Sequence, residues 1–86
     1  MQLSNLKIIR RAAVLSRFNM SKTWLCDRIK DGLIPPPFSL GGRAVGWLEH
    51  EINAVLLAMA AGKGEDDLKA LVQRLIDQRE FDISQD

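Results

Sequence analysis

Apolar residues recur at helical spacing in four segments of the chain. Two short segments, residues 11–18 and 22–31, lie in the first half, and two longer ones, residues 48–61 and 65–81, lie in the second. Residues three or four positions apart share one face of a helix, so each segment can bury one side and expose the other. The pattern therefore predicts four amphipathic helices. The apolar run before them, residues 6–10, fits either a short edge strand or a lead-in to the first helix.

The junction between the first two predicted helices fits a tight turn. Asn19 tolerates the left-handed conformation that such a turn needs, and Met20 can pack inward beneath it. Ser21 can accept a hydrogen bond from the free N–H groups at the start of the next helix, which makes it a natural N-cap. A helix, a tight turn and a capped helix together form the helix-turn-helix pattern.

Glycine and proline residues punctuate the chain after the second predicted helix. Gly32 suits the left-handed position that ends a helix, and the three prolines at 35–37 prevent its continuation. Two short apolar runs follow, residues 38–40 and 44–47, with two glycines and Arg43 between them. This arrangement predicts a β-hairpin with Arg43 at its tip, and we expect Trp47 at its end to pack into the core.

A helix-turn-helix followed by a hairpin is typical of a winged helix-turn-helix. The predicted fold is therefore mainly α with a small β-hairpin wing, followed by an extra C-terminal amphipathic helix.

Composition favours one small globular domain in a reducing cytoplasm. The chain has 86 residues, of which 47% are hydrophobic and 27% are charged. No apolar run approaches the ~18 residues of a membrane span, and the N-terminus does not resemble a signal peptide. The single cysteine allows no internal disulfide, and together with one histidine it makes no credible zinc cluster. We therefore expect no metal or other cofactor.

The net charge of +1 conceals an uneven distribution. Residues 1–47 hold eight lysines and arginines against two aspartates, a net +6, whereas residues 48–86 hold four against nine acidic residues, a net −5. A basic half that coincides with the predicted helix and hairpin is typical of polyanion binding. The alternative is that solvated charges have segregated by chance.

The outer side of the second helix is the predicted DNA-reading surface. At ~100° per residue this side lies opposite the apolar face, and it would enter the major groove. Lys22 can contact guanine or phosphate, and Asp27 either fits cytosine N4 or is a solvated charge. Arg43 can reach a phosphate or a minor groove, or it is simply exposed. The predicted DNA-contacting residues are Ser21, Lys22, Thr23, Cys26, Asp27, Lys30 and Arg43.

Trp24 could stack on a base and His50 could act as a ligand or a base, but neither role is favoured. Trp24 fits a cover over the seam between helices better than a base-stacking residue, because duplex DNA keeps its bases stacked. His50 has no neighbours in the sequence that would make it a ligand or a base, and we expect it to be exposed or partly buried.

The last predicted helix has an apolar stripe whose partner the sequence does not reveal. Residues 1–61 could form a complete DNA-binding domain, which leaves residues 62–86 as a C-terminal element ending in an acidic tail. The stripe could pack on its own domain or on a second copy, and dimerisation is the favoured interpretation. The residues of this stripe are Leu68, Leu71, Val72, Leu75 and Ile76.

Several short motifs resemble the AlpA-type family of phage regulators. They are the SKTWL run at residues 21–25, the acidic-glycine pair at 31–32, Ile34-Pro35, the stretch LGGRAVGW at 40–47, and Glu51-Ile52. The resemblance covers roughly residues 9–61 and is most specific in LGGRAVGW. It implies a winged fold similar to those of excisionases and MerR-type regulators, with DNA read by the residues named above.

This chain departs from the family pattern at three positions. Asn19 replaces a turn glycine, Cys26 and Asp27 replace an aromatic-basic pair, and Ile34 replaces an aromatic residue before the first proline. The second change affects the predicted reading surface, so a shared recognition sequence does not follow from the resemblance.

The leading functional prediction is a sequence-specific DNA-binding protein without enzymatic activity. The resemblance implies that it regulates integrase or excisionase genes of a prophage, or acts as a recombination directionality factor. Its expected partners are double-stranded DNA and a second copy or a cooperative assembly, with no membrane or small-molecule ligand. The alternative is a protein–protein adaptor that keeps the winged fold. An enzyme is disfavoured because the sequence offers no nucleophile–base pair, carboxylate pair or phosphate-binding loop.

Overall fold

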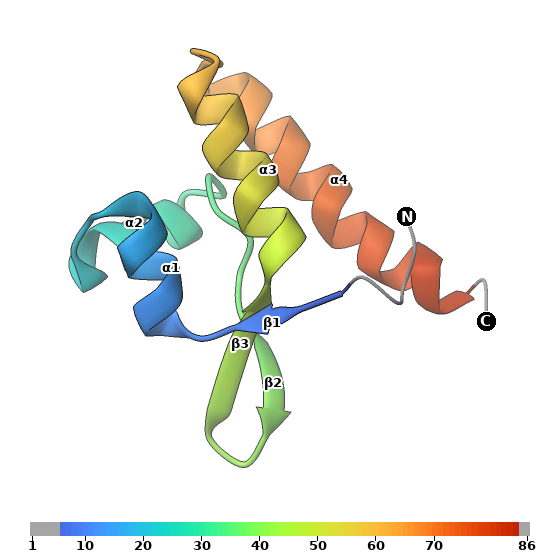
Figure 1. The fold of residues 1–86 in the computed structure, drawn as a ribbon. Coiled ribbons are helices and arrows are strands. Elements are labelled where there is room, and N and C mark those ends of the chain that lie inside the picture. Colours follow the sequence, from blue (N-terminus) through green and yellow to red (C-terminus); the bar gives the residue numbers. More distant parts are fainter. Residues whose placement is uncertain (1–5, 85–86) are drawn as a thin grey trace.

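The computed structural model describes residues 6–84, with side chains described as far as residue 80 (Figure 1). In the view of Figure 1, α3 stands between the α1–α2 pair and α4, and the β2–β3 hairpin projects away from the helices. The prediction of a mainly α fold with a β wing is confirmed. The elements are β1 (Ile8–Ile9), α1 (Arg11–Phe18), α2 (Lys22–Lys30), β2 (Phe38–Gly41), β3 (Ala44–Leu48), α3 (Glu49–Ala60) and α4 (Glu65–Ser84).

The helix-turn-helix forms as its sequence predicts, with one exception. Asn19 ends α1 in the left-handed conformation, with φ of 55°. The Ser21 hydroxyl oxygen accepts a hydrogen bond from the Trp24 backbone N–H at 3.2 Å and so caps α2. The inward packing predicted for Met20 is wrong, because its side chain is 46% exposed.

The sheet has three antiparallel strands in the order β1-β3-β2, so β3 is central. Of the two structures considered for residues 6–10, the short strand is the correct one, since Ile8 pairs with Leu48. Gly46 permits this close approach, because a Cβ built there would lie 2.6 Å from the Ile8 Cγ2 atom.

The hairpin turn depends on two glycines and an irregular register. Gly41 and Gly42 have φ of 103° and 56°, which side-chain-bearing residues rarely adopt. The register shifts between Ser39 and Gly41, and the Ser39 hydroxyl oxygen accepts a hydrogen bond from the Gly41 N–H at 3.1 Å. The turn therefore places Arg43 at the tip, as the sequence predicts.

Trp47 is the largest side chain in the core and is 1% exposed, which confirms its predicted position. Its indole Nε1–H donates to the Pro35 carbonyl at 3.0 Å, so the buried polar atom is satisfied. The core draws on every helix and on the sheet. It consists of Ile9, Val14, Leu25, Ile34, Trp47, Ile52, Val55, Val72 and Leu75.

The apolar stripe of α4 packs within the chain. Leu68 and Val72 are each 3% exposed and Leu75 is 8% exposed, while Leu71 and Ile76 are half-buried against the same core. The premise of the dimerisation prediction, an apolar face without an intramolecular partner, is therefore wrong. Within the described residues before α4, one side of the core stays open, and Val72 and Leu75 of α4 close it. The boundary drawn at residue 61 thus falls in a turn, with one core on both sides of it.

The helix ends differ slightly from those expected. α2 ends at Lys30 and α4 continues to Ser84, so the acidic tail predicted from residue 81 begins inside the helix. Residues 85–86 of that tail lie outside the described residues.

Candidate nucleic-acid interface

The outer side of α2 is exposed along its whole length. Helical spacing turns Leu25 into the core, where it is 1% exposed, and Ile29 packs half-buried on the same side. The opposite side therefore faces solvent. All six residues predicted from this region are exposed, namely Ser21, Lys22, Thr23, Cys26, Asp27 and Lys30.

Trp24 supports this surface from its edge. It is half-buried, its ring lies 5.3 Å from that of Phe18, and the Arg28 guanidinium lies 5.4 Å from its ring centroid. Trp24 therefore covers the seam between α1 and α2, as predicted. Arg28 is half-buried against this ring, which leaves Lys22 and Lys30 as the exposed cations of α2.

Arg43 is exposed at the tip of the hairpin, with no ion pair among residues 6–80. Figure 1 shows this tip and the α3–α4 turn at opposite ends of the view. A cation at the end of a projecting hairpin can meet a polyanion without first breaking an internal contact.

Part of the basic half is used internally. Arg17 donates from Nη2 to Glu49 Oε2 and from Nη1 to Asn53 Oδ1, both at 2.5 Å, which ties α1 to α3. Lys7 also lies 3.9 Å from the Glu49 carboxylate. Among the described residues of the basic half, the exposed cations without an ion pair are Arg10, Arg11, Lys22, Lys30 and Arg43.

Comparison with known proteins identifies the family. A family model described as "Prophage CP4-57 regulatory protein (AlpA)" matches residues 7–54, which include α1, α2 and the whole sheet. The chain belongs to the AlpA family. It is also 32% identical over 57 residues to the "Uncharacterized protein ORF88" of Enterobacteria phage P4, a match that covers 66% of this chain and 65% of the relative. No solved structure matches the chain.

The family match places this chain among regulatory proteins of phage origin and leaves α4 outside the matched residues. In this AlpA-family member α4 is joined to the matched part by a feature that the sequence analysis missed. Glu51 on α3 is 1% exposed, and both its carboxylate oxygens accept hydrogen bonds from Arg79 on α4. A signal for it exists, because Glu51 lies four residues before the buried Val55 and so shares its face.

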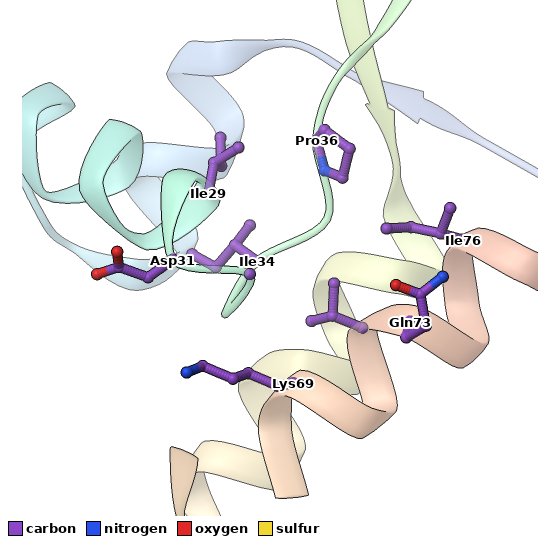
Figure 2. Close-up of a pocket in the computed structure, with 9 residues that line it drawn as sticks. Ile29, Asp31, Ile34, Pro36, Lys69, Gln73 and Ile76 are labelled. Atoms are coloured by element: carbon purple, nitrogen blue, oxygen red, sulfur yellow. The ribbon is translucent and has the colours of Figure 1, made fainter. Parts of the chain in front are cut away.

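A groove separates the end of α2 from the middle of α4 in this AlpA-family chain. Its volume is about 380 Å³, and its lining includes the buried Val72. Figure 2 shows Ile29, Asp31 and Ile34 on one side of the groove and Lys69, Gln73 and Ile76 on the other.

Neither a metal site nor a membrane span is found in the described part of the AlpA-family chain. Within residues 6–80, no three histidine, cysteine or acidic side chains are grouped as a metal site. None of the described helices is long and apolar enough to span a membrane.

Proposed function

We propose that this chain binds double-stranded DNA sequence-specifically, with the outer side of α2 in the major groove and Arg43 of the wing on the backbone. The observation that carries this proposal is the selective use of charge. Arg17 is paired with Glu49 and Arg28 lies half-buried against Trp24, whereas Lys22, Lys30 and Arg43 are exposed and free of ion pairs among the described residues. Exposed cations on a helix and on a hairpin tip can replace the counterions of a DNA backbone.

The roles within this surface follow from side-chain chemistry. Lys22 and Thr23 in the first turn of α2 can reach base edges or phosphates, and Asp27 can accept from cytosine N4. Arg10 and Arg11 at the start of α1 add two exposed cations for phosphates. Cys26 and Lys30 complete the same exposed side of α2.

The first experiment is binding of the purified chain to short DNA fragments from its own genetic neighbourhood, at about 50 and about 200 mM salt. We expect tight, salt-sensitive binding to one fragment, and a loss of about a hundredfold in the Lys22→Ala, Arg43→Ala double variant, because each charge-assisted contact contributes roughly tenfold. Melting temperature should hardly change, since both side chains are exposed.

The matched control compares the single variants Lys22→Ala and Lys69→Ala. Each removes one positive charge from an exposed side chain, but Lys69 lies on α4, outside the assigned surface. Equal losses in the two single variants would mean that only net charge matters and would reject the assigned surface. Absence of binding to every fragment would reject DNA binding and favour the adaptor function.

The proposed regulatory role is control of a prophage or similar mobile element. A protein of this family would act on integrase or excisionase genes, or direct recombination, and it would do so without an enzymatic activity or cofactor of its own, in the bacterial cytoplasm. A footprint over a promoter would support transcriptional control, and a footprint over the element's end would support recombination.

Assembly with a second copy is part of the proposal, because one small domain makes few base contacts. Leu57 on α3 is 72% exposed, the most of any large hydrophobic side chain described. It lines a groove of about 680 Å³ between α3 and α4, together with several alanines. Lys63, Asp67 and Arg74 also line this groove, so a twofold-related copy could pair opposite charges across the contact.

The Leu57→Glu variant tests this assembly. We expect the parent to have a dimer mass by light scattering on DNA or at high concentration, and the variant to be monomeric, because a buried unpaired carboxylate opposes association. Met20→Glu, which changes an exposed apolar residue of the helix-turn-helix, is the control for the measurement at high concentration without DNA and should keep the dimer mass there. A parent that is monomeric both free and on DNA would reject the assembly but not DNA binding.

A further inference from the structure

Arg79 of α4 contacts three separate parts of the chain. Its Nε–H donates to Glu51 Oε2 at 2.9 Å, and Nη2 donates to Glu51 Oε1 at 2.5 Å. The same Nη2 donates to the Pro36 carbonyl at 3.1 Å. The guanidinium also lies 5.6 Å from the centroid of the Phe38 ring. One side chain thus joins α4 to α3, to the loop before the wing and to the first residue of β2.

Burial and paired hydrogen bonds define the geometry of this contact. Glu51 is 1% exposed, and the side chain of Arg79 is only 20% exposed, so water competes little for their hydrogen bonds. The two parallel bonds to one carboxylate fix the plane of the guanidinium as well as its position. The third bond then holds the Pro36 carbonyl at a set distance from α3.

Pro36 and Phe38 are the base of the wing. Phe38 begins β2 and pairs with Gly46 of β3, so its position sets the direction in which the hairpin leaves the core. At about 3.3 Å per residue, the tip lies roughly 13 Å beyond Phe38, and a small tilt at the base moves Arg43 by a larger distance. The groove in Figure 2 runs between this loop and α4, with Pro36 on one wall and Ile76 on the other.

We propose that Arg79 is a positioning residue for the wing, which fixes the orientation at which the hairpin presents Arg43 to the DNA backbone. This inference rests on the proposed function and deepens it, because it gives α4 a role in DNA binding. Arg79 lies beyond residues 7–54, so the family match does not supply this role.

The test is a double-mutant cycle between the base and the tip of the wing. The Glu51→Leu, Arg79→Met double variant removes the ion pair without changing net charge or leaving a buried charge unpaired. It should fold, bind DNA about tenfold more weakly than the parent, and lose the contribution of Arg43. In the parent, Arg43→Ala should cost about tenfold and reduce the slope of log affinity against log salt by about 1. In the Glu51→Leu, Arg79→Met background, Arg43→Ala should change neither the affinity nor the salt slope.

Two controls separate positioning from charge and stability. Lys69→Met removes an exposed cation from the same helix, and it should leave the effect of Arg43→Ala intact. Arg17→Met breaks the α1–α3 contact, which lies away from the wing, and should also leave the effect of Arg43→Ala intact. An Arg43→Ala effect that stays tenfold in the Glu51→Leu, Arg79→Met background would overturn the inference.

Hydrogen exchange supplies a readout that does not depend on DNA. The amides of β2 and β3 should exchange faster in the Glu51→Leu, Arg79→Met variant than in the parent, while those of α1 and α2 should not change. If the parent binds no DNA, the proposed function fails, and faster exchange confined to the hairpin still supports the bracing by Arg79. Unchanged exchange in the hairpin would overturn the inference whether or not DNA binds.

Discussion

Replacing Trp47 by Ala should lower the free energy of unfolding by about 3–5 kcal/mol. The side chain is 1% exposed and central in the core, so its removal leaves a cavity that neighbours on several elements cannot all fill. It also leaves the Pro35 carbonyl without its 3.0 Å hydrogen bond. Denaturant unfolding monitored by circular dichroism measures the loss.

Two further tryptophan variants should each cost less stability than Trp47→Ala. Trp47→Phe keeps most of the apolar volume and should cost less than Trp47→Ala, because only the indole N–H and part of the ring are lost. Trp24→Ala removes a half-buried ring and should also cost less. A soluble Trp47→Ala variant with the stability of the parent would show that this residue does not carry the core.

The local elements of the fold follow from short-range signals in the sequence. Apolar spacing predicts the helices, and single residues with special backbone or hydrogen-bonding properties predict their ends, as Asn19 and Ser21 show. The hairpin follows from two glycines between apolar runs. These features depend on neighbours within a few residues, so they can be deduced without knowing the rest of the structure.

The packing of α4 and the pairing of charges could not be deduced in the same way. An apolar stripe shows that a helix face is covered, but it does not say whether the cover is the same chain or another. Glu51 and Arg79 are 28 residues apart, and Arg17 and Glu49 are 32 apart, so no local spacing links either pair. The candidate site shows the same limit. Its exposed side of α2 is predictable, but which basic residues remain free depends on these distant pairs.

Replacing Arg79 alone by Met should cost about 3–5 kcal/mol of stability, because it leaves the Glu51 carboxylate buried at 1% exposure without its partner. Replacing Glu51 alone by Leu should cost less, since the side chain of Arg79 is 20% exposed and its guanidinium can turn toward water. Thermal and denaturant unfolding of the two single variants measure this order.

The Glu51→Leu, Arg79→Met double variant should regain most of the stability that Arg79→Met loses, because no charge then remains buried without a partner. Such recovery would mean that the pair serves geometry more than stability, since apolar residues would hold α4 equally well. A double variant as unstable as Arg79→Met would instead show that the hydrogen bonds themselves hold α4 in place. If Glu51→Leu were the more damaging single change, the burial argument would be contradicted. Arg79, the more exposed partner, would then be the costlier one to leave unpaired.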